Sequence, residues 1–118
     1  MSNANISALA LNQQNIIVPN LNGGTYGFSL GTGSTQVLAA NPQVQKVTFH
    51  NPGSVNLYVC QANDANGNPL TPGPNPGNWE IFPGATWSFS GNGAGGAWLA
   101  AAASGSGNPL TVAASQTL

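Results

Sequence analysis

The chain has 118 residues, of which 41% are hydrophobic, and only Lys46, Asp64 and Glu80 carry a full charge at pH 7. This length fits one domain with a single core, and the composition excludes intrinsic disorder, which combines low hydrophobicity with high net charge. A single cation excludes electrostatic binding to nucleic acid or to anionic membranes, because every phosphate that is neutralised needs a cation.

The N-terminal residues 1–13 contain alanine and leucine without a helix cap, and we expect them to form an arm that lies on a neighbouring molecule. They have neither the basic start nor the continuous apolar run of a secretory signal, so we expect no export by that route. No apolar run approaches the ~20 residues of a membrane-spanning helix. We expect residues 14–118 to form one domain.

Sixteen glycines and nine prolines separate short runs that are rich in β-branched and aromatic residues, which is the pattern of short β-strands. The run 97–103 is rich in alanine, the best helix former, but it is short and flanked by glycine, which favours a strand. The pattern predicts an all-β fold, a single-domain antiparallel β-sandwich or jelly roll of about eight to nine strands. The candidate strands are 15–18, 25–30, 35–39, 44–50, 55–61, 79–82, 86–90, 97–102 and 110–113.

Two turns with a clear mechanism join neighbouring strands of this set. Asn51-Pro52-Gly53-Ser54 combines a proline that presets φ with a glycine that tolerates positive φ, and it predicts a hairpin from Val44 to Gln61. Pro83-Gly84 fits a type II turn and predicts a second hairpin from 79 to 89. Its aromatic residues, Trp79, Trp87 and Phe89, are expected to anchor the core.

The segment 62–78 contains four prolines and no periodicity, which predicts a long irregular loop. Loops of this length are commonly functional, so this loop is the candidate surface for assembly or recognition. Its residues with that role are Asp64, Asn66, Asn68, Pro72, Pro74, Asn75 and Pro76.

The spacing of oxygen-bearing side chains from Asp64 to Asn68 is similar to the start of a calcium-binding loop. However, Pro69 and Asn75 occupy the positions that such a loop gives to glycine and to a bidentate glutamate. We therefore expect an Asn-Gly turn and no metal.

Other chemical motifs lack their partners. Gly91 to Gly96 matches the letters of the dinucleotide fingerprint, but no acidic residue follows Glu80 to bind a ribose, so a flexible hairpin loop is expected. Cys60 is the only cysteine and lies in an apolar run, which predicts a buried thiol. His50 is the only histidine, and nothing in the spacing selects a nucleophile beside it. The sequence predicts no catalytic residue, no cofactor and no metal site.

Residues 47–60, followed by Ile81-Phe82-Pro83-Gly84 and by Trp98-Leu99-Ala100-Ala101, resemble the small β-sandwich structural proteins of tailed bacteriophages. The likeness covers roughly residues 35–113. It implies a virion component, a head decoration or cement protein that sits on the capsid lattice, often as a trimer. The implied partners are further copies of the chain and the major capsid protein or another virion protein, and no catalytic residue is carried over.

Two functions of different classes stay open. The leading one is a non-enzymatic virion structural protein, because a net charge of −1 gives little repulsion between copies. The alternative is a carbohydrate- or receptor-binding module of a phage tail or surface appendage. Burial of the aromatic residues decides between them, since only exposed rings can stack on sugars. The rings concerned are Trp79, Trp87, Trp98, Tyr26 and Tyr58.

Overall fold

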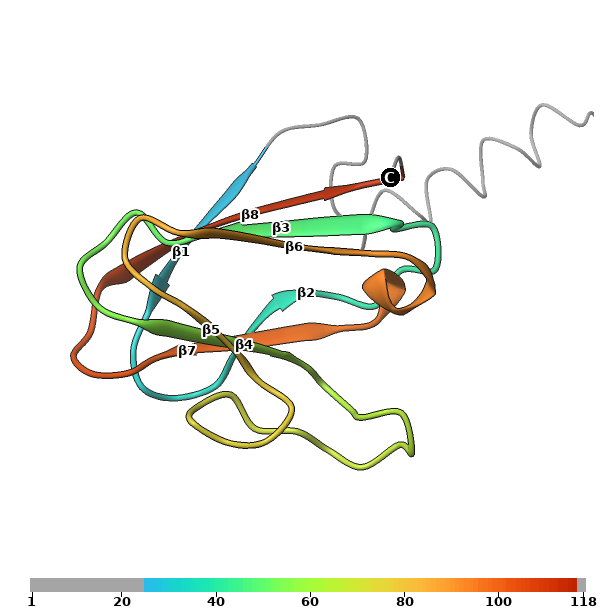
Figure 1. Cartoon of the computed structure of the whole chain (residues 1–118), viewed down its shortest axis with the longest axis horizontal. Coiled ribbons are helices and arrows are strands. Elements are labelled where there is room, and N and C mark those ends of the chain that lie inside the picture. The colour runs from blue at the N-terminus through green and yellow to red at the C-terminus, as the bar shows by residue number, and fades with distance from the viewer. Residues whose placement is uncertain (1–24, 117–118) are drawn as a thin grey trace, which may run out of the picture.

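A computed structural model describes residues 25–116, and the predicted arm at 1–13 and strand at 15–18 lie outside the described residues. Within 25–116, eight strands form two antiparallel sheets of four strands each (Figure 1). The predicted β-sandwich is therefore confirmed. The strands are β1 (Tyr26–Leu30), β2 (Thr35–Leu38), β3 (Lys46–His50), β4 (Leu57–Gln61), β5 (Trp79–Ile81), β6 (Thr86–Ser90), β7 (Trp98–Ala102) and β8 (Asn108–Ser115), with a 3-10 turn, η1 (Asn92–Gly95), before β7.

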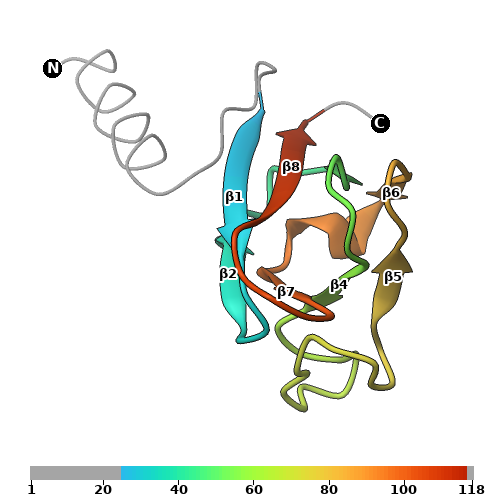
Figure 2. The ribbon, with the colours of Figure 1, turned by 90° about the vertical axis from the view of Figure 1, so that its left-hand side faces the viewer.

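The strand order identifies the kind of sandwich. One sheet has the order β1-β8-β3-β6 and the other β2-β7-β4-β5. Each strand of the first half thus pairs with its counterpart in the second half: β1 with β8, β2 with β7, β3 with β6 and β4 with β5. The chain folds back once, at 62–78, and the doubled ribbon rolls into two sheets, which is a jelly roll. Figure 2 shows the fold-back loop at the bottom of the molecule, beyond β4 and β5.

Both predicted hairpins are wrong. β3 and β4 lie in different sheets, so 51–56 crosses the sandwich, and 82–85 likewise crosses from β5 to β6. The alternation of apolar residues was interpreted correctly, since Val47 and Phe49 are fully buried. Alternation gives each strand a buried face, but it does not say whether the next strand lies beside it or opposite it across the core.

Asn51 explains why the two crossings lie together. Its side chain is fully buried, and its amide nitrogen donates to the carbonyls of Val55 and Ile81, both at 2.8 Å. Its side-chain oxygen accepts from the amide of Gly53 at 3.0 Å. The backbone of Asn51 also bonds the second crossing, because its N–H donates to Ala85 and its carbonyl accepts from Gly84. Asn51 therefore forms hydrogen bonds to both crossing segments and holds them at the same end of the sandwich.

Strand boundaries differ from the prediction mainly at β8, which extends through Pro109 to Ser115. β8 pairs with β1 over 108–112 but with β3 only from Thr111 onward. At Pro109, β8 has a neighbour on one side only among the described strands, so this end of the strand is an edge, where proline is tolerated. The alanine-rich run forms β7, and the predicted strand is confirmed.

The core lies between the sheets, and its largest fully buried side chains are Trp98 and Phe49. Their rings are tilted against each other with centroids 5.3 Å apart. The glycine-rich segment 91–96 is not a flexible hairpin loop. It forms η1 and crosses from β6 to β7, with Ala94 buried and its carbonyl bonded by the indole N–H of Trp98 at 3.1 Å. In the described part of the chain no helix is long and apolar enough to cross a membrane.

Candidate functional site

The tip of the 62–78 loop is built around Asp64. Its carboxylate accepts from the amides of Asn66 and Asn68, both at 2.9 Å, and Asn63 forms a β-bridge with Pro69. These hydrogen bonds, first that from Asn68, lower the pKa of the Asp64 carboxyl below its usual value. Gly67 has φ of +84°, as the predicted Asn-Gly turn requires. The carboxylate of Asp64 is thus occupied by its own loop.

The second half of the loop is organised by Asn78. Its amide nitrogen donates to the carbonyls of Thr71 and Asn75, and its side-chain oxygen accepts from Gly73. Pro72 is buried and contributes little to the exposed surface of the loop. The predicted surface residues that are exposed are Asn66, Asn68, Pro74, Asn75 and Pro76, whereas Asp64 is half-buried.

A polar cluster that the sequence did not predict lies on the outer face of the β2-β7-β4-β5 sheet. Tyr58 and Glu80 are paired across β4 and β5, and their neighbours Leu57 and Ile81 point into the core. Oε2 of Glu80 accepts from the amide nitrogen of Asn56 at 2.8 Å and from the hydroxyl of Tyr58 at 3.3 Å. Burial, then the charge of Glu80 and this hydrogen bond, raise the pKa of the Tyr58 phenol.

Phe82 extends this surface. It follows β5 directly and is 57% exposed, the most exposed large hydrophobic residue of the described chain. Glu80 and Phe82 are both exposed and Ile81 between them is buried, which is the pattern expected if Phe82, the first residue after β5, points to the same side as Glu80. We call Asn56, Tyr58, Glu80 and Phe82 the outer-sheet patch.

The tryptophans lie elsewhere, at the edge where β5 and β6 close the sandwich. Trp79 and Trp87 have ring centroids 4.5 Å apart, and both contact the buried Trp98 at 6.1 Å. Trp98 is fully buried, Trp87 is half-buried and Trp79 is 37% exposed. Trp79, Trp87 and Phe89 were predicted to anchor the core: Trp87 and Phe89 are partly buried and pack against it, whereas Trp79 is exposed. Trp98 is therefore not available for stacking on sugars, and Trp79 is the most exposed of the three tryptophans.

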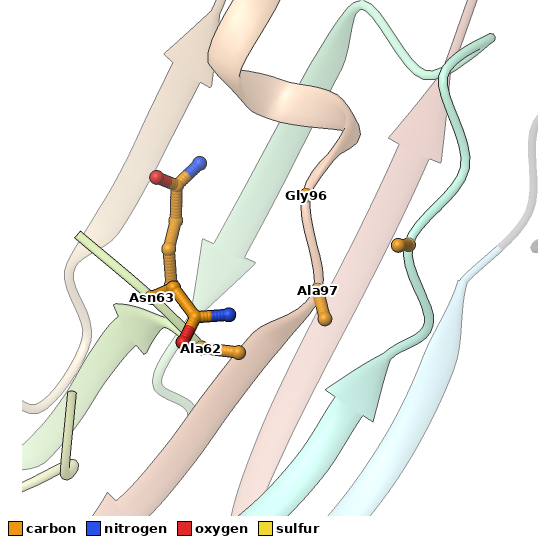
Figure 3. Close-up of a pocket in the computed structure, with 6 residues that line it drawn as sticks. Ala62, Asn63, Gly96 and Ala97 are labelled. Atoms are coloured by element: carbon orange, nitrogen blue, oxygen red, sulfur yellow. The ribbon is translucent and has the colours of Figure 1, made fainter. Parts of the chain in front are cut away.

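One pocket, of about 250 Å³, opens where the end of β4 meets the segment after η1 (Figure 3). Ala62 and Asn63 form one wall, and Gly96 and Ala97 form the other, joined by the bond from the Ala62 amide to the Ala97 carbonyl. Gln61, which also lines the pocket, donates its side-chain N–H to the Gly93 carbonyl. No lining residue is titratable, so the pocket holds no acid or base for catalysis.

The histidine and the cysteine of the chain do not form a site with a carboxylate. Nδ1 of His50 contacts the carbonyl of Ala85 at 3.1 Å and the hydroxyl of Thr86 at 2.9 Å, rather than a carboxylate. Cys60 is fully buried, as predicted, and burial raises the pKa of its thiol. Among residues 25–116 no group of three or more His, Cys, Asp and Glu side chains could hold a metal ion.

The sequence contained one signal for the outer-sheet patch, because alternation places Asn56, Tyr58 and Glu80 away from the core. The sequence did not indicate that β4 pairs with β5, because the two strands are separated by the 17-residue loop 62–78. Comparisons of the chain with protein-family models, with curated proteins and with solved structures gave no match. The resemblance to phage β-sandwich proteins therefore stays a prediction.

Proposed function

We propose that this protein is a non-enzymatic virion structural protein, a decoration or cement protein that self-associates, as a trimer, on the head of a tailed phage. The observation that carries the proposal is the edge strand β6. It pairs only with β3 among the described strands, and it contains no charged residue and no proline. Edge strands of monomeric proteins are usually protected by such residues or by bulges, because their free backbone groups can pair with another chain.

The other sheet makes the contrast clear. Its edge strand β2 has a register shift between Gln36 and Leu38, and its edge strand β5 is three residues long and contains Glu80. Both features discourage pairing with a further strand. β6 has five residues, and its exposed side chains are Thr86, Ser88 and Ser90. Hydroxyl groups lose less solvation than charges when a partner covers them.

Charge and fold class support the same conclusion. The net charge of −1 leaves little repulsion between copies. Jelly rolls occur in viral capsid domains, although a fold alone does not determine a function. If β6 joins a different edge of the next copy, the contact is head-to-tail and a closed trimer results from a three-fold rotation.

Light scattering during size exclusion tests the assembly. The full chain is expected to elute at three times the 11.8 kDa of one chain. Ser88→Lys places a charge on the β6 edge and should shift the protein toward the monomer, whereas Ser88→Thr keeps the hydroxyl and serves as the matched control. Cryo-electron microscopy of purified particles then tests the location. A protein that is monomeric at every concentration and missing from virions contradicts the proposal.

A second function, glycan or receptor binding, is favoured by one specific observation. The tryptophans are largely occupied by the core, but Tyr58 and Phe82 reach the surface beside a carboxylate. Jelly rolls also occur in lectin domains. This second function uses the opposite sheet from β6, so both functions can exist in one protein.

A further inference from the structure

We propose that the outer-sheet patch of Asn56, Tyr58, Glu80 and Phe82 binds neutral carbohydrate, with Glu80 accepting hydrogen bonds from sugar hydroxyls and the two rings covering the apolar faces of the sugars. The inference rests on the second function above and names its site. It moves that function away from the tryptophans and from the proline-rich loop, where the sequence placed it.

One carboxylate oxygen of Glu80 is free to accept a hydrogen bond from a ligand. Both of its hydrogen bonds are made by Oε2, to Asn56 and Tyr58. Oε1 has no hydrogen-bond partner among the described residues, so it can accept from a hydroxyl group without breaking an existing bond. The two donors also fix the carboxylate on a rigid pair of strands, which reduces the entropy lost when a ligand binds. Charge-assisted hydrogen bonds of this kind are stronger than neutral ones.

The surroundings supply the other groups that a sugar needs. The side-chain oxygen of Asn56 is a second free acceptor, and the oxygen of the Tyr58 hydroxyl, whose proton is donated to Glu80, can accept a further hydrogen bond. Neither Tyr58 nor Phe82 stacks on another ring among residues 25–116, so the ring faces are not covered by other aromatics. Rings that present apolar faces beside polar groups match the alternating C–H and O–H surfaces of a pyranose.

A cationic ligand fits less well. Aromatic cages for ammonium groups enclose the cation between rings, and among residues 25–116 neither Tyr58 nor Phe82 is part of an aromatic ring pair. The patch carries one negative charge, and two donors already partly neutralise it. Anionic polysaccharides are disfavoured by the same carboxylate and by the lack of cations in the chain. Uncharged sugar chains remain the ligand class that the patch fits.

The test uses the full chain with ¹⁵N labelling and four probes: maltohexaose, cellohexaose, mannohexaose and a chitin hexamer. At least one probe is expected to shift amide signals of Asn56, Tyr58, Glu80 and Phe82, while those of the β6 edge stay in place. Glu80→Ala and Phe82→Ala should each weaken binding about tenfold or more. Thr32→Ala, an exposed substitution at the turn between β1 and β2, is the matched control and should leave the affinity unchanged.

Different failures separate the site from the function. If a probe binds but shifts signals only around 62–78 or Trp79, the site is wrong and the binding function stands. If none of the four probes binds, the carbohydrate inference fails together with the glycan-binding form of the second function, whereas its receptor-binding form does not depend on this result. If tetramethylammonium shifts the patch signals and the sugars do not, the patch is a cation site and the carbohydrate inference is overturned.

Discussion

Replacing Asn51 by alanine should be among the most destabilising single substitutions in this protein, although Asn51 lies in a turn. The change removes both N–H donors that satisfy the Val55 and Ile81 carbonyls, and it removes the acceptor for the Gly53 amide. The Ile81 bond is buried and the other two are partly buried. A buried group left without its partner costs about 1–3 kcal/mol, and a partly buried one costs less. The three losses together predict a decrease of about 3–5 kcal/mol in the free energy of unfolding.

Asn41 is the matched control, since it is also a buried asparagine, at 4% exposure. Its side-chain oxygen accepts from the Gln43 amide at 3.0 Å, but its amide nitrogen is buried without a partner. Asn41→Ala loses one bond and also removes a donor that was desolvated without compensation. The two effects oppose each other, and the net change should stay within about 1 kcal/mol.

Urea and thermal unfolding of both variants at one fixed protein concentration measures the difference. For a domain of this size, a loss of 3–5 kcal/mol corresponds to a Tm lower by roughly 10–25 °C. Asn51→Asp adds a pH test, because it places a carboxylate opposite two carbonyl oxygens and should raise the pKa of that carboxyl. Its stability should then improve as pH falls toward ~4, where the protonated acid can donate. Equal losses in Asn41→Ala and Asn51→Ala would refute the reasoning.

Three further predictions concern other parts of the fold. Gly95→Ala should destabilise the protein by about 1–3 kcal/mol, because a Cβ there would lie 2.7 Å from the Asn41 carbonyl oxygen. Gly27→Ala is the control: a Cβ at Gly27 meets no atom within 4 Å, so this variant should be neutral or stabilising in the same unfolding assay. Cys60 should react with a thiol reagent only as fast as the protein opens, and rapid labelling under native conditions would contradict its burial. Because the pKa of the thiol is raised from 9.0, the stability of the wild type should begin to fall as pH rises above that value, whereas that of Cys60→Ala should fall only from about 10.0, where the raised pKa of Tyr58 contributes in both proteins. Because the pKa of Asp64 is lowered by hydrogen bonds of its own loop, those bonds should persist above the ordinary value of 3.8 and weaken as pH falls below it. Exchange-corrected amide protection of Asn66 and Asn68 measures this, and protection that is unchanged in acid would count against the Asp64-centred loop.

Most strands could be predicted from the sequence because the residue pattern that indicates a strand lies within that strand and its flanking turns. Val47 and Phe49 alternate with polar residues, and β-branched and aromatic runs end at proline or glycine, so local periodicity and turn chemistry place most strands within a few residues. Cys60 and β7 were predicted for similarly local reasons. None of these features requires knowledge of which strand lies beside which.

Pairing failed because it is not a local property in a jelly roll. Among the strands of residues 25–116, six of the seven connections cross between the sheets, and only β4 and β5 are neighbours both in the chain and in a sheet. A turn such as 51–54 has the same residue chemistry whether it joins paired strands or crosses the core. The six residues between His50 and Leu57 are longer than the two-residue loops of tight hairpins, and this length is the signal that favours a crossing.

The candidate site depends on that same pairing, which is why its residues could not be grouped from the sequence. Tyr58 and Glu80 are 22 residues apart and become neighbours only because the chain folds back at 62–78. The fold-back also places both acidic residues of the chain on one β4–loop–β5 unit, while Lys46 lies in the other sheet. The two carboxylates differ in their free hydrogen-bond acceptors. Asp64 accepts hydrogen bonds from its own loop, whereas one carboxylate oxygen of Glu80 accepts none from the described residues. In a chain with so few charges, the free oxygen of Glu80 is the strongest hydrogen-bond acceptor on that sheet, and its availability follows from the jelly-roll pairing rather than from any sequence motif.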